Sequence, residues 1–279
     1  MANQTFSRPN SITAADFEKY LERQRLSPHT IVAYTFTVND FLGRFDGPTA
    51  ENLGSYRKYL AESFSPATVN LRIRAMDKYL RCCGLDDMQL QGVPVQQRSC
   101  LENLISTAEY ERFKECLRLE NNKQMFFCVC FMAMTGVRIS ELIKIQAHHV
   151  RSGHIDIYGK GGKFRRIFIP ERLRAETLVW MASSGREEGS IFLNHSGRQI
   201  SVRGVSIQLK RMAEKYGIDP SLVHPHAFRH LFAKNFIDRV GDVALLADLL
   251  GHSSIETTRI YLRRTGAEQK AIIEKAVDW

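Results

Sequence analysis

The longest uninterrupted apolar stretch of the chain is residues 125–134, with the sequence MFFCVCFMAM. A transmembrane helix needs about 20 apolar residues, so this stretch is too short to span a bilayer. A helix that is apolar on every side has no face for water and must be surrounded by other elements. We therefore expect a central buried helix here, interrupted by the Thr135-Gly136 pair that follows.

The N-terminal third predicts a small helical domain. Thr13 and Asp16 have the spacing of a capping box, and Ser27-Pro28 and Ser65-Pro66 each place a capping residue before a first-turn proline. Apolar residues recur at helical spacing after each signal. With a further helix at 50–61, four short helices are expected within about 75 residues.

A linker and a second domain are expected to follow. Residues 84–106 lack sustained periodicity, and a chain of 279 residues suggests two domains. We expect domains at 1–95 and 107–279, joined by a linker at 96–106. The alternating pattern of residues 154–170 around a glycine-rich centre predicts a β-hairpin. Further helices are expected at 107–119, with Thr107 as the cap, and at 175–182, 202–216, 226–239, 243–250 and 255–261. The fold class is thus mainly α with one small hairpin.

The charge balance favours an anionic partner. The chain carries 39 basic and 30 acidic side chains, a formal net charge of +9, and nucleic acid is the commonest partner of such a surface. The six cysteines include no CxxC pair, and the N-terminus has no apolar core like that of a signal peptide. We expect reduced thiols, no zinc, no disulfides, no membrane association and a cytoplasmic location.

Several residues suit phosphodiester chemistry without a metal. Such a reaction needs a nucleophile, cations for the non-bridging oxygens and a proton donor for the leaving oxygen. His226 and Arg229 are three residues apart and share a helix face. His252 follows a glycine, and Tyr261 lies nine residues beyond it. A guanidinium presents a planar fork to phosphate, so Arg138 and Arg229 are candidates for holding one. This set suggests a covalent link between the tyrosine and DNA.

These residues stand in boxes that resemble those of the tyrosine recombinases, the group with the phage-type integrases and the Xer-type resolvases. The boxes are TGVRISEL with Arg138 and Glu141, YGKGGKFRR with Lys160, HPHAFRH with His226 and Arg229, LLGH with His252, and TTRIY with Tyr261. They cover roughly residues 107–261. The resemblance implies a C-terminal mixed α+β catalytic domain, and more loosely an N-terminal four-helix core-binding domain.

The resemblance also implies roles. Tyr261 would attack the scissile phosphate and form a 3′-phosphotyrosyl link. The phosphate would be held by Arg138 and Arg229 with a hydrogen bond from His252, while Lys160 acts as general acid toward the 5′-oxygen. His226 would assist proton transfer at the tyrosine, and Glu141 would support the arginines. No metal or nucleotide cofactor is implied.

The partner is expected to be double-stranded DNA with specific recombination sites. Cationic side chains on the helical domain, the hairpin and helix 202–216 are candidate DNA contacts, with solvated faces as the alternative: Arg74, Lys78, Arg81, Lys163, Arg165, Arg166, Arg203, Lys210 and Arg211. The resemblance implies a tetramer on two sites. The tail at 266–279 would dock on a neighbouring subunit, or else on its own domain. A partner recombinase or an accessory protein is also possible.

Two other functions remain open from the sequence. A type IB topoisomerase uses the same tyrosyl chemistry, and a non-catalytic DNA-binding accessory protein would share the positive charge. The compact helical domain favours a recombinase, and the complete set of catalytic residues argues against an accessory protein. Xer-like chromosome dimer resolution, element integration, transposon resolution and inversion share these residues, so the sequence does not select among them.

Overall fold

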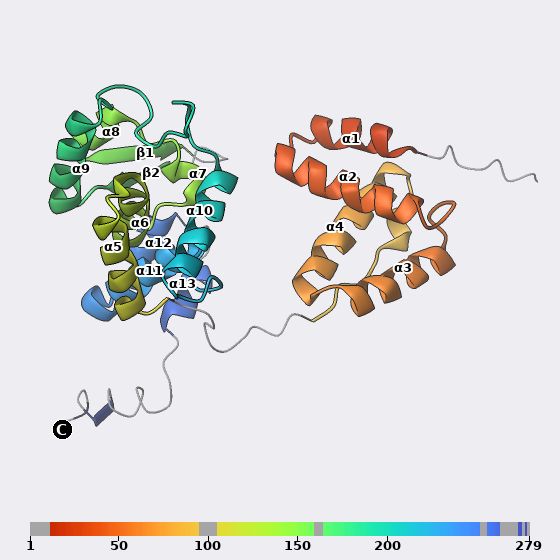
Figure 1. Cartoon of the computed structure of the whole chain (residues 1–279). Helices are drawn as coiled ribbons and strands as arrows, with labels where there is room; N and C mark the ends of the chain where they lie inside the picture. The colour runs from red at the N-terminus through yellow and green to blue at the C-terminus, as the bar shows by residue number, and fades with distance from the viewer. Residues whose placement is uncertain are drawn as a thin grey trace, which may run out of the picture. The chain divides into compact units, whose positions relative to one another are not determined.

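The computed structural model describes residues 12–94, 105–158, 164–251, 256–262, 273–274 and 277. The chain forms two compact units, Met1–Gln97 and Arg98–Trp279. Figure 1 shows a helical smaller unit and a larger unit that combines helices with one hairpin. The division between the units falls inside the predicted linker at 96–106.

In residues 12–94 the smaller unit forms four helices, as expected. They are α1 (Ala14–Arg23), α2 (Pro28–Leu42), α3 (Ala50–Ser63) and α4 (Pro66–Cys82), followed by a 3-10 turn, η1 (Asp86–Met88). Thr13 forms the predicted capping box with Asp16, and the Ser27 side chain accepts the backbone N–H of Thr30. The apolar faces of the helices meet in a core that includes Phe17, Phe41, Tyr56 and Ile73. One strip of exposed residues on α4 carries Arg74 and Arg81.

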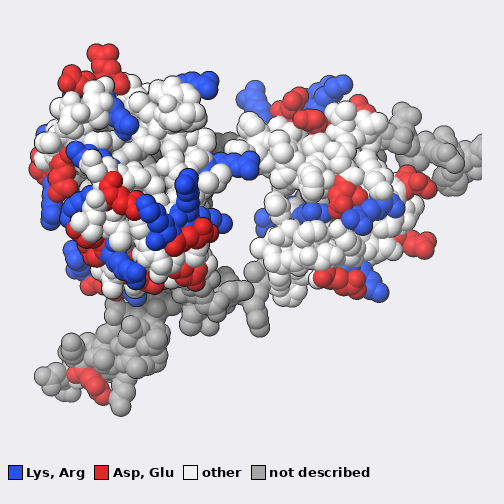
Figure 2. Space-filling view, in the orientation of Figure 1, with Lys and Arg blue, Asp and Glu red and all other residues white. Residues whose placement is uncertain are grey.

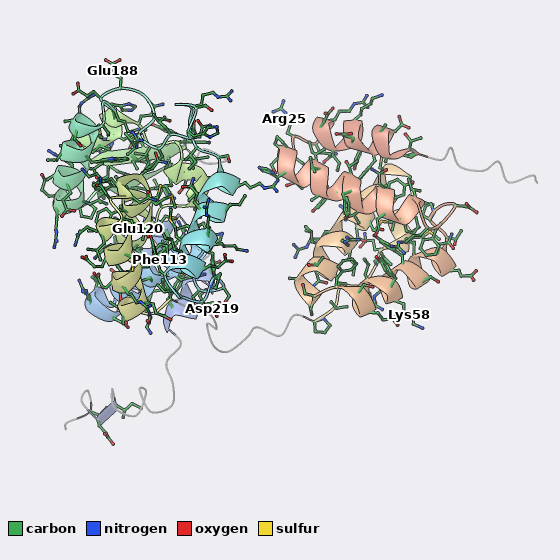
Figure 3. The ribbon with its side chains drawn as sticks, viewed as in Figure 1. Arg25, Lys58, Phe113, Glu120, Glu188 and Asp219 are labelled. Carbon is green, nitrogen blue, oxygen red and sulfur yellow. The ribbon has the colours of Figure 1, made fainter. Side chains whose placement is uncertain are left out.

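The larger unit is built around the predicted central helix. Its elements are α5 (Thr107–Leu119), α6 (Lys123–Thr135), α7 (Ile139–Leu142), α8 (Ala147–Ser152), β1 (His154–Tyr158), β2 (Phe164–Phe168), α9 (Glu171–Ser183), α10 (Val202–Lys215), α11 (Pro225–Val240), α12 (Val243–Leu250), α13 (Glu256–Arg259) and η3 (Ile260–Leu262). Residues 125–132 of α6 are all buried, and α6 packs on α5, α9 and α11. Phe113, labelled in Figure 3, joins α5 to this core through the rings of Tyr216 and Phe228.

The predicted hairpin is confirmed. Strands β1 and β2 pair antiparallel, with Ile155 opposite Ile167 and Ile157 opposite Arg165. Ile155 and Ile167 are buried in the main core, so one face of the hairpin is held against the helices. Strand β2 also contacts α12, which brings the hairpin next to the C-terminal part of the chain. The mainly α fold class with one small hairpin is therefore confirmed.

Some element boundaries differ from the predictions. The cap of α5 is Ser106 rather than Thr107, because the Ser106 backbone N–H donates to the Glu109 carboxylate (2.8 Å) while Glu109 N–H donates back to the Ser106 hydroxyl (3.1 Å). The predicted helix at 255–261 is a short helix, α13, followed by the 3-10 turn η3. Helices α7 and α8 were not predicted, since they are too short to show periodicity. None of the described helices is long and apolar enough to cross a membrane.

Candidate active site

The two predicted phosphate-binding arginines come from different elements and meet at the C-terminal end of α12. Arg138 is the N-cap residue of α7, directly after the turn that ends α6. Arg229 lies on α11 and is 5% exposed. Arg165, which was predicted to contact DNA from the hairpin, joins them, because its side chain is only 9% exposed. The structure thus gathers three guanidiniums where the sequence predicted two.

Each of these guanidiniums donates to one carbonyl at the end of α12. The last carbonyls of a helix lack partners within the helix and carry the negative end of its dipole, so they attract cations. The hydrogen bonds run from Arg165 Nη1 to the Leu249 carbonyl (3.0 Å), from Arg229 Nη2 to the Leu250 carbonyl (2.7 Å) and from Arg138 Nη2 to the Gly251 carbonyl (3.1 Å). The end of α12 therefore organises the cationic cluster.

Glu141 balances part of this positive charge. One carboxylate oxygen lies 3.2 Å from Arg138 Nη1, and the other lies 2.5 Å from Arg165 Nη2. Burial, together with the charges of Arg138 and Arg165, lowers the pKa of Arg229 to about 10, so this guanidinium is still charged at neutral pH. Among the described residues of the cluster, three guanidiniums against one carboxylate leave an excess positive charge that suits a phosphate.

Glycines allow the chain to pass closely at two points of this cluster. Gly136 has a φ of +64°, and its carbonyl accepts a hydrogen bond from Arg229 Nη1 (2.6 Å). A Cβ at Gly136 would lie 2.5 Å from a ring carbon of Phe232 and 2.9 Å from a methyl of Leu250. At Gly251, where φ is +63°, a Cβ would lie 2.5 Å from the Arg165 side chain. These contacts explain why TGVR and LLGH each contain a glycine.

Replacing Gly136 by alanine should therefore destabilise the larger unit. The left-handed backbone costs a non-glycine residue about 1–2 kcal/mol, and the forced contacts with packed side chains add about 1–3 kcal/mol. Gly241→Ala is the matched control, because Gly241 has a φ of +75° but open space around it. Urea denaturation should show the larger loss of unfolding free energy for Gly136→Ala. Equal losses in both variants would contradict the predicted contacts.

The candidate nucleophile is docked on its own subunit. Tyr261 lies in η3 and is 8% exposed. Its ring packs in an apolar cluster with Ile237 of α11 and with Leu246 and Leu250 of α12. Its hydroxyl oxygen lies 2.6 Å from His230 Nδ1. Burial raises the pKa of Tyr261, and the positive charge of Arg229 opposes that shift. The tyrosine is thus held next to the cationic cluster in its neutral form.

His230 is a site residue that sequence reasoning missed. It follows Arg229 directly in the HPHAFRH box and lies one helical turn after His226. His226 itself is exposed near the start of α11, and the two imidazole rings are 6.3 Å apart. The i, i+4 spacing of the two histidines is a signal that could have drawn attention to His230. Only the docking of Tyr261 shows which imidazole lies on its hydroxyl.

The remaining predicted site residues lie away from this cluster or outside the described part of the chain. Lys160, Lys163 and His252 lie outside the described residues, as does nearly all of the tail at 266–279. Arg166 pairs with Asp156 at 2.7 and 2.8 Å on the outer side of the hairpin. Arg203, Lys210 and Arg211 are exposed on α10, and Lys78 is half-buried on α4.

The surface charges are mixed rather than segregated. Figure 2 shows Lys and Arg side chains interspersed with Asp and Glu on the visible face of both units. That view shows no patch of basic residues alone, so the candidate DNA contacts are identified only by the elements that carry them.

Comparisons with known proteins show which family the chain resembles. Residues 99–268 match the phage integrase family. Tyrosine recombinase XerA of Thermococcus kodakarensis is 30% identical over 277 residues, which cover 97% of this chain and 96% of the relative. Tyrosine recombinase XerA of Pyrococcus furiosus is 30% identical over 268 residues, with coverage of 94% and 92%.

Several solved structures share the fold over nearly the whole chain. The Tn1549 transposon integrase in complex with transposon right end DNA has a TM-score of 0.72 at 16% identity, covering 95% of this chain and 99% of that one. The family match and the relatives that align along almost their entire length decide the assignment. The chain belongs to the phage integrase family and is a site-specific tyrosine recombinase, an enzyme that transfers DNA strands.

Proposed function

We propose that this recombinase cuts and rejoins DNA through a 3′-phosphotyrosyl intermediate formed on Tyr261. The observation that carries the proposal is the docking of the Tyr261 hydroxyl beside the cluster of Arg138, Arg165 and Arg229 within one subunit. Arg138 is 36% exposed at its side chain and can reach a phosphate without leaving Glu141. The nucleophile and the phosphate-binding groups are thereby supplied by the same chain.

The chemistry follows from the charges of these groups. A phosphate bound between Arg138 and Arg229 would have its non-bridging oxygens neutralised, which lowers the barrier to attack by an oxygen nucleophile. Lys160 is proposed as general acid for the leaving 5′-oxygen, and His252 as a further donor to the phosphate. Exchanging one phosphodiester for a phosphotyrosyl ester keeps the bond energy nearly constant, so the reaction needs no nucleotide cofactor.

The role of Glu141 is to hold Arg138 and Arg165 together. Without its carboxylate, two guanidiniums would repel each other at the end of α12. We assign Arg165 a structural role in the site rather than a DNA contact, since its guanidinium donates hydrogen bonds to the Glu141 carboxylate and the Leu249 carbonyl. The proposed DNA contacts are accordingly the more accessible cations: Arg74, Lys78, Arg81, Lys163, Arg166, Arg203, Lys210 and Arg211.

The proposed substrate is double-stranded DNA that carries specific recombination sites. The proposed location of the enzyme is the cytoplasm. The Tn1549 transposon integrase in complex with transposon right end DNA, which shares the fold, supports this partner. The test is to trap the covalent complex in cells, purify it under denaturing conditions and sequence the attached DNA. Reads that converge on one short motif support site-specific recombination. Reads spread over the genome would support a topoisomerase-like activity instead.

The sequence around the trapped motif also defines the biological role. A site near the replication terminus indicates chromosome dimer resolution, whereas sites at the ends of a mobile element indicate integration or excision. Inverted pairs of sites indicate inversion.

We further propose that the enzyme assembles as a tetramer on two DNA sites through its tail at 266–279. The larger unit carries a groove of about 500 Å³ between α5, α6, α9 and α11. Its lining combines apolar side chains with charged side chains of both signs, among them Phe126, Phe232, Phe236, Val240, Lys114, Arg118, Arg239, Glu111 and Glu176. The tail sequence offers apolar residues among charged ones of both signs, and its Ile273 and Val277 are 61% and 47% exposed. A neighbouring subunit's tail therefore suits this groove in polarity, since apolar side chains on each side would be covered.

Deleting residues 266–279 should weaken assembly and recombination while leaving single-site binding intact. Val240→Asp should have the same effect in the full-length chain, because Val240 lines the groove and is 54% exposed. Val32→Asp is the matched control, since Val32 is 67% exposed on the other unit. Sedimentation on two-site DNA measures assembly, and a gel shift with one site measures binding. Normal recombination by the truncated protein would refute the proposed docking.

A further inference from the structure

The imidazole that contacts the Tyr261 hydroxyl is His230. Its Nδ1 lies 2.6 Å from the tyrosine oxygen, and the two rings lie 5.5 Å apart at an angle of 51°. The family resemblance gives proton transfer at the tyrosine to His226, which is one helical turn away and exposed. A group that receives a proton must lie within hydrogen-bond reach of it. In this structure His230 meets that requirement.

Both partners of this hydrogen bond are held by packing. His230 lies within α11 between buried Arg229 and buried Leu231. Tyr261 is fixed by the apolar cluster of α11 and α12, which includes Ile237 and Leu250. Because η3 packs directly on α11, the distance between the two groups is set by core contacts rather than by a solvated loop. The contact between His230 and Tyr261 is therefore fixed by the packing of the core.

His230 is surrounded by groups that keep it neutral. Burial lowers its pKa to about 4, with further contributions from His226 and Arg229 on the same helix and from its N-cap residue, His224. From η3, the group that faces it is the Tyr261 hydroxyl. At neutral pH the imidazole therefore carries one bare nitrogen. If that nitrogen is Nδ1, the tyrosine hydroxyl donates to it, and the hydroxyl oxygen keeps its lone pairs for attack.

We propose that His230 accepts the proton of Tyr261 during strand cleavage, an inference that rests on Tyr261 being the nucleophile. As the tyrosine oxygen forms its bond to phosphorus, its O–H bond breaks and the proton moves to His230 Nδ1. The bond from phosphorus to the 5′-oxygen breaks in the same step, and that oxygen takes a proton from the general acid. In rejoining, the 5′-hydroxyl oxygen forms its bond to phosphorus and returns its proton to the general acid, while the phosphotyrosyl bond breaks and His230 returns its proton to the tyrosine oxygen.

Binding of DNA would prepare His230 for this role. The scissile phosphate brings negative charge next to Arg229 and His226, two of the groups that disfavour an imidazolium here. Since an added negative charge favours protonation of a nearby base, His230 becomes a better proton acceptor when the substrate is in place. Without DNA, the tyrosine stays protonated and unreactive.

The variant that tests this inference is His230→Asn. Asparagine places an amide near the position of Nδ1, so it can keep a hydrogen bond to Tyr261 but cannot accept a proton. The substrate is the site recovered from the trapped DNA, prepared with either oxygen or sulfur as the 5′-bridging atom of the scissile phosphate. Sulfur leaves without being protonated, so the sulfur substrate reports on the tyrosine side of the reaction alone. The readout is the single-turnover rate of adduct formation across a range of pH.

His230→Asn should lose about 10²- to 10³-fold at pH 7 on both substrates, as expected for a missing general base. Its rate should rise with pH toward the ordinary tyrosine pKa of about 10, while the wild-type rate levels off. Lys160→Ala provides the contrast, because sulfur should restore its rate. Circular dichroism and DNA binding confirm that each variant is folded.

Three results separate the possible failures. A His230→Asn rate within about threefold of wild type, with the same pH profile, would overturn proton acceptance by His230. Proton acceptance by His230 would also be overturned if His226→Asn, and not His230→Asn, slowed cleavage of the sulfur substrate by about 10²- to 10³-fold. An adduct that survives Tyr261→Phe would instead overturn the proposed nucleophile, whatever His230 does.

Discussion

Tyr261→Phe is expected to abolish the covalent protein–DNA adduct while leaving DNA binding unchanged. The substitution removes only the hydroxyl, because the ring packs in the apolar cluster of α11 and α12 and phenylalanine fills the same space. The hydrogen bond to His230 is lost with the hydroxyl, and its net contribution to stability is about 1 kcal/mol. The catalytic loss should therefore be complete without loss of the fold.

The adduct is measured by denaturing gel electrophoresis after incubation with a nicked substrate, which traps the intermediate because the cut strand diffuses away. Tyr158→Phe is a suitable control, since Tyr158 is exposed at the end of β1. That variant should form the adduct at the wild-type rate. Adduct formation by Tyr261→Phe would mean that another residue is the nucleophile.

Replacing Arg138 or Arg229 by lysine should slow strand cleavage by about 10²- to 10³-fold. Of the two variants, only Arg229→Lys should also destabilise the protein. Arg138 and Arg229 each lose the fork that matches a phosphate. Arg229 is buried and also joins the Gly136 carbonyl to the Leu250 carbonyl. Lysine cannot keep both bonds, and a lost hydrogen bond to a charged group costs about 1.5–3 kcal/mol.

Arg138→Lys should leave stability within about 1 kcal/mol of wild type, because its guanidinium is partly solvated. Single-turnover cleavage and urea denaturation of both variants measure the two effects separately. Equal stability of the two variants would contradict the bridging role of Arg229. Wild-type cleavage by Arg138→Lys would remove Arg138 from the phosphate site.

The parts of the fold that the sequence predicts well are those with strong local signals. The apolar stretch in α6, the capping residues before α1 and α2, and the alternating hairpin each depend on neighbours within a few positions. The predicted helix 243–250 coincides with α12. Short helices such as α7 and α8 show no full period, so their existence depends on tertiary contacts that a periodicity argument does not contain.

The geometry of the candidate site could not be predicted from local sequence signals, because its contacts join residues that are far apart in the sequence. Arg138 and Arg165 donate to carbonyls that lie 113 and 84 residues further along the chain. In the sequence Arg165 is one of several hairpin cations, and nothing in its neighbourhood distinguishes it from Arg166, which pairs with Asp156 instead. The HPHAFRH motif likewise points to His226 and not to His230. Both assignments depend on where α12 and η3 dock, which is a property of the packed core.

The most direct test of the proposed chemistry is to locate the DNA attachment on the protein. The covalent complex is trapped, digested with protease and nuclease, and the modified peptide is sequenced by tandem mass spectrometry. We predict a nucleotide joined through its 3′-phosphate to the hydroxyl oxygen of Tyr261. A nucleotide on any other residue, or one joined through a 5′-phosphate, would contradict the proposed active site.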